Sequence, residues 1–214
     1  MRIIGVDESG KGDFFGPLVI AALLAPDAQI DLLKQAGARD SKLVADSRVL
    51  AIDQILREQF SHVVVVVLPV EYNRRYQQIK NLNKMLAAGH AEVIEKLAAK
   101  SDADLAISDK FGKPELIEGE LAKRGQTIRL RQITRGEAIP QVAAASILAR
   151  AEFIRQMKAM SEAYAVDFPK GAASHVDAAG QNFVRIHGAD KLVQVAKLHF
   201  KNYQRVVQPR FAGH

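Results

Sequence analysis

The stretch that decides the fold is Ile3-Ile4-Gly5-Val6-Asp7-Glu8-Ser9-Gly10-Lys11-Gly12-Asp13. It begins with a short run rich in β-branched residues, which predicts a strand, and it ends in a glycine-rich turn. A second apolar run at residues 18–24 follows closely and predicts another strand. Two strands so near each other in sequence indicate an antiparallel pair. The two adjacent acids therefore close the first strand, just before the turn.

Three further segments have the composition of strands. Residues 62–70 contain five successive valines, which indicate a strand buried on both faces. Residues 105–108 form a brief apolar run, and residues 127–133 alternate apolar and basic side chains as a half-exposed strand does. The sequence therefore predicts five strands.

Apolar residues recur at helical spacing in residues 47–59 and 81–100. Pro140 suits the first turn of a helix, and an alanine-rich segment extends from it to about Tyr164. Another helical segment is expected near residues 190–198. We therefore expect an α/β fold with a five-stranded mixed central sheet flanked by helices. Because no linker or repeat interrupts the chain, we expect one domain, residues 1–214, with a helical, basic C-terminal part.

The composition excludes several classes of protein. The 214 residues include no cysteine, which excludes disulfides, thiolate zinc sites, iron–sulfur clusters and cysteine nucleophiles. No apolar run approaches the ~20 residues that span a bilayer, and the N-terminus lacks the layout of a signal peptide. We therefore expect a cytoplasmic monomer with no membrane partner. The net charge of +6 permits a polyanionic partner.

Four acids stand beside predicted elements. Asp7 and Glu8 follow the first strand, Asp109 follows the fourth, and Glu137 precedes the alanine-rich helix. Taken alone, the first three suit solvated turns and Glu137 suits the first turn of a helix. A central sheet can, however, bring strand ends and a helix start together. Four oxygen donors at one point would need divalent cations, and two such ions support in-line displacement at phosphorus.

A phosphate-binding loop is the competing interpretation of the first motif. Gly5, Gly10 and Lys11 match the spacing of such a loop, but Gly12 stands where it needs a serine or threonine to hold Mg²⁺. The two acids inside the loop would also repel the phosphates of a nucleotide. We therefore interpret this match as accidental.

The stretch Asp7-Glu8-Ser9-Gly10-Lys11-Gly12-Asp13-Phe14-Phe15-Gly16-Pro17-Leu18-Val19 resembles the opening motif of the type 2 ribonucleases H, in the ribonuclease HIII version. The resemblance continues along almost the whole chain. Six further segments resemble motifs of the family in the family's order: Asp40-Ser41-Lys42, Asn81-Leu82-Asn83-Lys84, Asp109-Lys110-Phe111, and residues 142–150, 168–172 and 196–200.

The resemblance implies a ribonuclease H-like fold and an active site of four acids. Asp7 and Glu8 match the first two acids, Asp109 the third and Glu137 the fourth. These residues are expected to be both catalytic and metal-binding, with Mg²⁺ or Mn²⁺ as the divalent ion. Glu152 is the nearest rival for the fourth position, but a solvated helix face explains it better. The implied reaction cleaves the RNA strand of an RNA–DNA hybrid and leaves 5′-phosphate and 3′-hydroxyl ends.

The resemblance also implies a nucleic-acid-binding surface. Backbone groups of Gly10, Lys11 and Gly12 are expected to reach the ribose 2′-hydroxyl, which distinguishes RNA from DNA. Lys11, Lys42 and Lys170 are expected to hold phosphates without reading bases. Each of the three lysines, taken singly, is equally well explained as a solvated side chain.

Two departures from ribonuclease HII favour the HIII branch. Ribonuclease HII has a tyrosine after a Lys-Gly pair, where this chain has Ala172, and it has Gly-Arg-Gly where this chain has Gly-Lys-Gly. The chain starts at the catalytic strand, so we expect the N-terminal substrate-binding domain usual in HIII to be absent and hybrid binding to be salt-sensitive. The alternatives are HII-like cleavage at single ribonucleotides in duplex DNA and a non-catalytic hybrid-binding module.

Overall fold

A computed structural model describes residues 1–38 and 44–208 of the chain. The chain divides into two compact units, each built from segments that are not contiguous in sequence. Unit 1 comprises Met1–Ser9, Val19–Val66 and Asn81–Glu152. Unit 2 comprises Gly10–Leu18, Val67–Lys80 and Phe153–His214. The expectation of a single catalytic domain stays a prediction.

Unit 1 contains a five-stranded sheet with the strand order β3-β2-β1-β4-β5. The central strand β1 pairs antiparallel with β2 and parallel with β4, and β4 pairs parallel with β5. The sheet is therefore mixed, as the sequence predicts. The strands are β1 (Arg2–Ser9), β2 (Leu18–Pro26), β3 (Ser61–Val67), β4 (Leu105–Asp109) and β5 (Arg129–Ile133).

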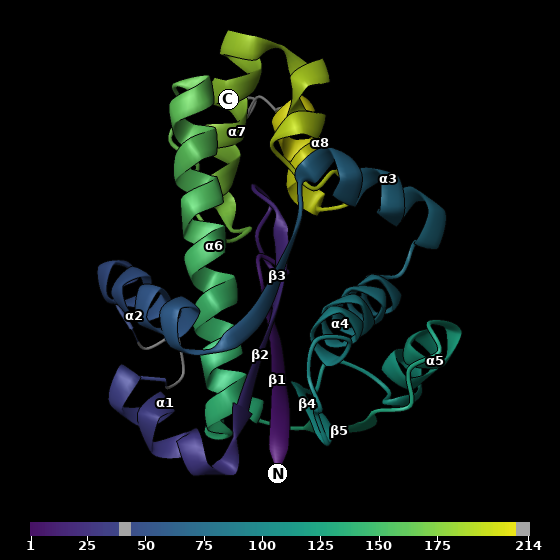
Figure 1. Ribbon diagram of the computed structural model, residues 1–214. Coiled ribbons are helices and arrows are strands. Elements are labelled where there is room, and N and C mark those ends of the chain that lie inside the picture. The colour runs from purple at the N-terminus through teal and green to yellow at the C-terminus, as the bar shows by residue number, and fades with distance from the viewer. Residues whose placement is uncertain (39–43, 209–214) are drawn as a thin grey trace. The chain divides into compact units, whose positions relative to one another are not determined.

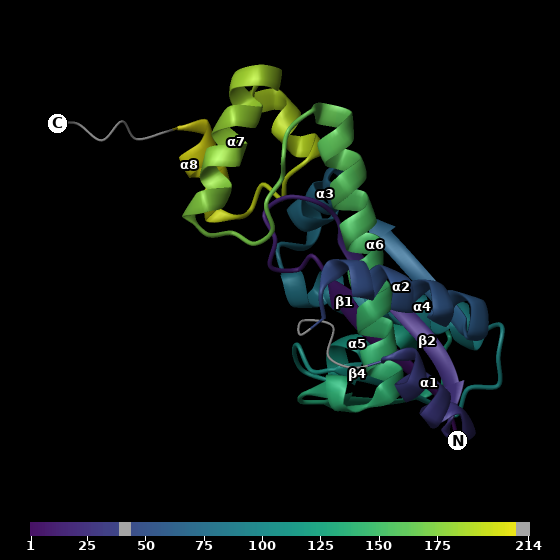
Figure 2. The same ribbon diagram turned by 90° about the vertical axis from the view of Figure 1, so that its left-hand side faces the viewer.

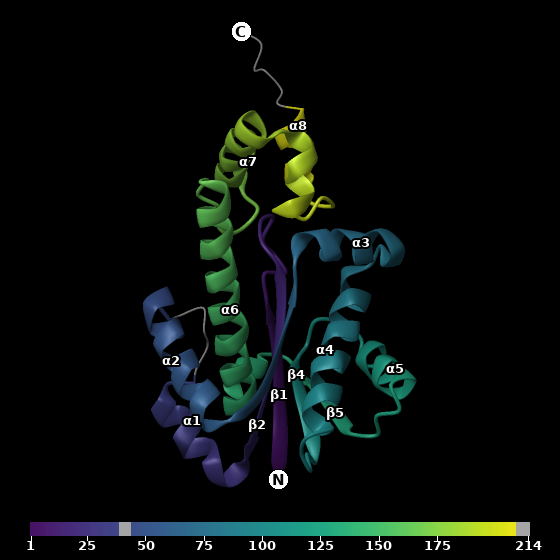
Figure 3. The same cartoon turned by 45° about the horizontal axis from the view of Figure 1, so that its top comes forward.

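Helices cover both faces of this sheet (Figures 1 and 3). The first half of α6 lies on one face with α1 and α2, while α4 and α5 lie on the opposite face. The helices of unit 1 are α1 (Ile30–Ala36), α2 (Asp46–Gln59), α4 (Leu82–Ala98), α5 (Glu115–Lys123) and the first half of α6 (Pro140–Tyr164), with short 3₁₀ turns at Asp27–Gln29 and Gly136–Ala138.

Small residues let α6 approach β1 until their backbones touch. A Cβ atom at Gly5 would lie only 2.1 Å from the carbonyl carbon of Gln141, far inside any real contact. The alanines at positions 143–145 are at most 1% exposed. Because a helix with such short side chains packs closely, its buried face lies directly against the strand that carries the first two acids.

Unit 2 packs helices around a cluster of aromatic rings. Phe15 lies 4.7 Å from Phe14 and 4.8 Å from Phe168, between ring centroids, and Phe168 lies 5.7 Å from Phe183. Figure 2 shows α7 and α8 side by side. The helical elements of this unit are α3 (Pro69–Ile79), the second half of α6, α7 (Ser174–His187), the 3₁₀ segment Ala189–Gln194 and α8 (Lys201–Val207).

Several details of the secondary structure differ from expectation. The strand β1 extends to Ser9, so Asp7 and Glu8 lie within it instead of after it. The valines of β3 are half-buried apart from Val67, so the prediction of a strand buried on both faces is wrong. The reason is that β3 lies at the edge of the sheet that the described residues form, where β2 is its neighbour. The segment expected as a helix near residues 190–198 is a 3₁₀ segment, Ala189–Gln194. Among the helices that the structure describes, none is long and apolar enough to cross a membrane.

Candidate active site

Asp7 occupies the carboxyl-terminal part of β1, in register with Ala21 of β2. Its Oδ1 atom accepts a hydrogen bond from the backbone N–H of Glu8 at 2.8 Å. The pKa of Asp7 is raised to about 7, first by burial, then by the neighbouring charge of Glu8 and, more weakly, by that of Asp109. The hydrogen bonds from Glu8 and from the Ser146 side chain act in the opposite direction. Asp7 is therefore close enough to both Glu8 and Asp109 to be repelled by their charges.

A buried histidine connects Glu8 with the strand that carries Asp109. The Nε2 atom of His90, in α4, lies 3.0 Å from Oε2 of Glu8. Its Nδ1 atom lies 3.1 Å from the Ser108 hydroxyl, which donates to the backbone carbonyl of Asp109 at 2.8 Å. His90 and Ser108 are 0% exposed, so no water competes for these contacts. The Glu8 carboxylate is thereby held in one orientation.

Asp109 also fixes the turn that carries the fourth acid. It ends β4 opposite Ile133 of β5, and its Oδ1 atom accepts a hydrogen bond from the backbone N–H of Gly136 at 2.8 Å. Glu137 is the next residue and is half-buried. The 3₁₀ turn Gly136–Ala138 is thus attached directly to the third acid, because Glu137 follows the residue that is hydrogen-bonded to Asp109.

The rival acid Glu152 has a different environment. Its carboxylate contacts the Arg57 guanidinium at 3.3 Å, and Arg57 also donates two hydrogen bonds to the buried Asp53 at 2.9 and 3.0 Å. Glu152 is therefore part of an ion-pair group between α2 and α6. The expectation of a purely solvated face needs this correction, but an ion-paired acid is also a poor candidate for the fourth ligand.

The donor set fits a divalent cation. Mg²⁺ and Mn²⁺ prefer hard oxygen ligands, and Asp7, Glu8 and Asp109 supply only carboxylate oxygens, whose mutual repulsion a cation would relieve. Within residues 1–38 and 44–208, no three acidic or histidine side chains converge on one ion position. The carboxylates would therefore have to turn about their side-chain bonds to share an ion.

Most of the residues expected to bind nucleic acid lie together in unit 2. Gly10 has a φ of +86°, and a Cβ there would lie 2.2 Å from the Pro17 carbonyl oxygen, so the turn requires glycine. Gly171 donates from its backbone N–H to Asp13 Oδ1 at 2.6 Å and accepts from the Phe14 N–H at 2.9 Å. These bonds join the turn that contains Lys11 and Gly12 to the turn that contains Lys170. Lys42 lies outside the described residues.

Lys197 anchors the same turn from inside unit 2. Its Nζ atom donates to three backbone carbonyls, those of Asp13 at 2.9 Å, Phe15 at 3.4 Å and Gly16 at 2.7 Å. The side chain is 0% exposed, and burial lowers its pKa to about 7. A buried ammonium with three carbonyl acceptors fixes the course of the loop that follows the Gly-Lys-Gly turn.

Sequence reasoning did not find His90, Ser146 or Lys197. His90 interrupts the apolar stripe of α4 with a buried polar residue, and Lys197 is a charged residue between Ala196 and Leu198 in an apolar run. Each is therefore visible as a polar residue at a position where the pattern predicts an apolar one. Their partners are distant in sequence, so only the fold identifies them.

Comparisons with known proteins agree on one family. The family description Ribonuclease HII matches residues 4–203. The ribonuclease HIII of Chlamydia pneumoniae is 41% identical over 206 residues, which are 95% of this chain and 69% of that protein. That of Protochlamydia amoebophila is 37% identical over 204 residues, 95% of this chain and 68% of that protein.

Solved structures give the same result. Bst-RNase HIII in complex with Mn²⁺ is 32% identical and superimposes with a TM-score of 0.91 over 97% of this chain and 69% of its own. Ribonuclease H2 from Pyrococcus horikoshii OT3 has a TM-score of 0.82 over 96% of this chain and 97% of its own, and at 21% identity it shows the fold alone. The predicted ribonuclease H-like α/β fold is confirmed.

Proposed function

The chain belongs to the ribonuclease HII family, and from that premise we propose that Asp7, Glu8, Asp109 and Glu137 form the centre at which it cleaves RNA. As a ribonuclease H-type enzyme it is a metal-dependent hydrolase that acts on RNA–DNA hybrids. One observation supports the choice of acids above others. The pKa of Asp7 is raised to about 7 by burial and by the charges of Glu8 and Asp109, as expected where carboxylates gather around a cation site.

Each acid has a role that its surroundings suggest. Asp7 lies near the carboxyl end of β1, and Asp109 ends the parallel strand β4, so these two carboxylates would hold the ions. Glu8, held by His90, supplies an oriented oxygen, and Glu137 approaches from the turn bound to Asp109. Bound Mg²⁺ or Mn²⁺ would lower the pKa of water and stabilise the leaving oxygen, which leaves 5′-phosphate and 3′-hydroxyl ends.

The recognition of RNA is assigned mainly to the turns of unit 2 that carry Gly10, Lys11, Gly12 and Lys170. The backbone of Gly10, Lys11 and Gly12 contacts a ribose 2′-hydroxyl, and Lys11, Lys42 and Lys170 contact phosphates. The support for this proposal is that Asp13 and Phe14 are hydrogen-bonded to Gly171, so two of the three lysines lie on turns that are joined. We also place the enzyme in the cytoplasm and expect it to act as a monomer, which sedimentation at micromolar concentration can test.

The test compares hybrid cleavage by two variants, Glu137→Gln and Glu152→Gln. A labelled RNA–DNA hybrid is incubated with the protein in Mg²⁺ or Mn²⁺, with and without EDTA. We expect Glu137→Gln to reduce cleavage by at least about 100-fold, because it removes a ligand charge, and Glu152→Gln to leave it within about threefold, because it removes only part of an ion pair. Equal losses in both variants would remove Glu137 from the site.

A second substrate separates the branches of the family. A DNA duplex with one embedded ribonucleotide is tested beside the continuous hybrid. We expect the hybrid to be cleaved faster, because two ribonucleases HIII are 41% and 37% identical to this chain over 95% of its length. Preference for the single ribonucleotide would support HII-like specificity instead. Binding without any metal-dependent product would indicate a non-catalytic module.

A further inference from the structure

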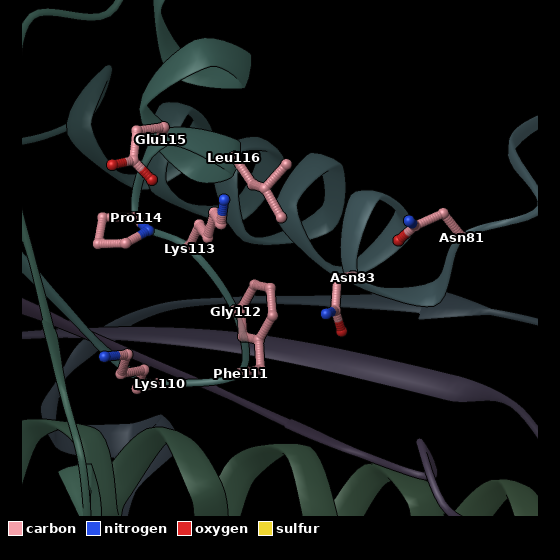
Figure 4. Close-up of a pocket in the computed structure, with 9 residues that line it drawn as sticks. All are labelled: Asn81, Asn83, Lys110, Phe111, Gly112, Lys113, Pro114, Glu115 and Leu116. Atoms are coloured by element: carbon pink, nitrogen blue, oxygen red, sulfur yellow. The ribbon is translucent and has the colours of Figure 1, made fainter.

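A surface pocket of about 840 Å³ opens beside the proposed site, entirely within unit 1 (Figure 4). It is formed by the start of α4, by the loop 110–114 between β4 and α5, and by Glu115 and Leu116 at the start of α5, so we call it the 110–116 pocket. Lys110 and Lys113 supply its positive charges, Asn83 its exposed amide, and Phe111 and Leu116 its apolar surface. Lys110, the first residue of the loop, directly follows the proposed metal ligand Asp109.

The walls of the pocket are fixed by contacts behind them. The Phe111 ring packs edge-on against His90, with 4.8 Å between ring centroids, and the Lys110 N–H donates to the Ile133 carbonyl at 3.1 Å. On the opposite side, Asn81 caps α4 by accepting from the Lys84 N–H at 3.1 Å. The loop is therefore tied to the core on one side, while the lysine and amide groups remain on the exposed side of the pocket.

The chemistry of the lining favours one class of ligand. Two ammonium groups outnumber the single carboxylate, Glu115, so the pocket attracts an anion. The amide of Asn83 can donate to phosphate or sugar oxygens, and the half-buried Phe111 offers an apolar surface to a ribose or base. A purely apolar partner would leave both lysines and the amide without acceptors.

We propose that the 110–116 pocket binds a nucleotide of the hybrid next to the cleaved bond, with Lys113 on its phosphate. This inference rests on the proposed function, because it takes Asp109 as a ligand of the catalytic ions. Lys110 directly follows Asp109 in the chain, and Phe111 contacts His90, which in turn contacts Glu8, so the pocket adjoins the proposed site. The pocket extends the binding surface in unit 1, independently of the turns in unit 2.

The first experiment measures binding and turnover of Lys113→Ala. The matched control is Lys100→Ala, at an exposed lysine just beyond the end of α4. Fluorescence anisotropy in EDTA gives the affinity for an uncleaved hybrid. We expect Lys113→Ala to weaken binding about 5- to 10-fold and to lower the slope of log K against log salt by about 0.9, the loss of one phosphate contact. The kcat at saturating hybrid should be unchanged, and the control should match the unsubstituted protein.

A second variant blocks the space instead of removing a charge. A Cβ at Gly112 would meet the Asn83 amide and the Leu116 methyl at 3.5 Å, which is ordinary contact, so Gly112→Leu is tolerated by the backbone and fills the pocket. We expect KM for the hybrid to rise about 10-fold with kcat unchanged. Unchanged KM in both Gly112→Leu and Lys113→Ala would overturn the proposal, while intact cleavage by the unsubstituted protein would leave the proposed function standing.

Neutral phosphate analogues identify the strand. Single phosphates near the cleaved bond are replaced by methylphosphonates, in the RNA strand or the DNA strand, one position at a time. At one position the unsubstituted protein should lose affinity while Lys113→Ala loses no more, because the contact is already absent. If the losses add at every position in both strands, Lys113 contacts no phosphate and the proposal fails.

Discussion

Replacing Asp7 with asparagine should abolish cleavage and yet stabilise the metal-free protein. The pKa of Asp7 in the folded state is about 7 against an ordinary 3.8, so its ionisation opposes folding. Each pKa unit corresponds to about 1.4 kcal/mol, which sets an upper limit of about 4 kcal/mol for the gain. Because the side chain keeps some contact with water, we expect about 2 kcal/mol above pH 7.

The sign of the effect gives it a definite pH window. A carboxyl whose folded pKa is raised binds its proton more tightly in the folded state between about pH 4 and 7. The unsubstituted protein therefore loses stability as the pH rises through this window, and the asparagine variant does not. The two proteins should have equal dependence on pH below about 4 and a constant difference above about 7.

Urea unfolding in EDTA at a series of pH values measures this difference. Asp53→Asn is the matched control, because the same substitution there leaves Arg57 without its buried partner and should destabilise by about 1–3 kcal/mol. Mg²⁺ or Mn²⁺ at 100 times its dissociation constant should raise the free energy of unfolding of the unsubstituted protein by about 2.7 kcal/mol, and should raise it much less in Asp7→Asn. If Asp7→Asn is less stable than the unsubstituted protein in EDTA at pH 8, the carboxylates are not crowded and the site is wrongly assigned.

Two further predictions concern the buried polar residues. His90→Ala should reduce cleavage about 10- to 100-fold, because Glu8 loses the group that orients it, and a titration of Mn²⁺ by calorimetry should show weaker binding; unchanged binding would contradict the role. Because burial lowers the pKa of Lys197 to about 7 from 10.5, the folded state should gain stability as the pH rises between these values, by up to about 1.4 kcal/mol per unit. Lys197→Met should lack this gain in urea unfolding from pH 7 to 10, so parallel pH curves for the two proteins would refute it.

The strands that carry Asp7 and Asp109 could be predicted from the sequence, because local residue patterns determine them. The β-branched run before Asp7 and the apolar run before Asp109 indicate strands, and the family resemblance selects these acids from the 24 aspartates and glutamates. Strand order is a property of the whole sheet, so the edge position of β3 left no local signal. The helix α7 was missed although its buried residues Val176, Gly180 and Phe183 recur at helical spacing, because a glycine within that face weakens the helical signal.

The polar groups that orient the acids and the adjoining turn could not be predicted, because their partners are far away in the sequence. His90 contacts Glu8, which is 82 residues away, and Lys197 contacts Gly16 across 181 residues. The apolar stripe of a helix predicts which of its sides faces the core. It does not predict which polar atom of another element that side will contact. Contacts of this kind depend on the register between elements, and the register is set by packing.

The contact between Gly5 and Gln141 extends the active site to a residue that carries no functional group. Gly5 lies two positions before Asp7 on the same face of β1, and Ser146 lies five positions after Gln141 in α6. A methyl group at position 5 would push α6 away from β1. The Ser146 hydroxyl would then move away from the Asp7 carboxylate, to which it is hydrogen-bonded. A survey that ranks mutations by their distance from the substrate would consequently underestimate the effect of substitutions at Gly5.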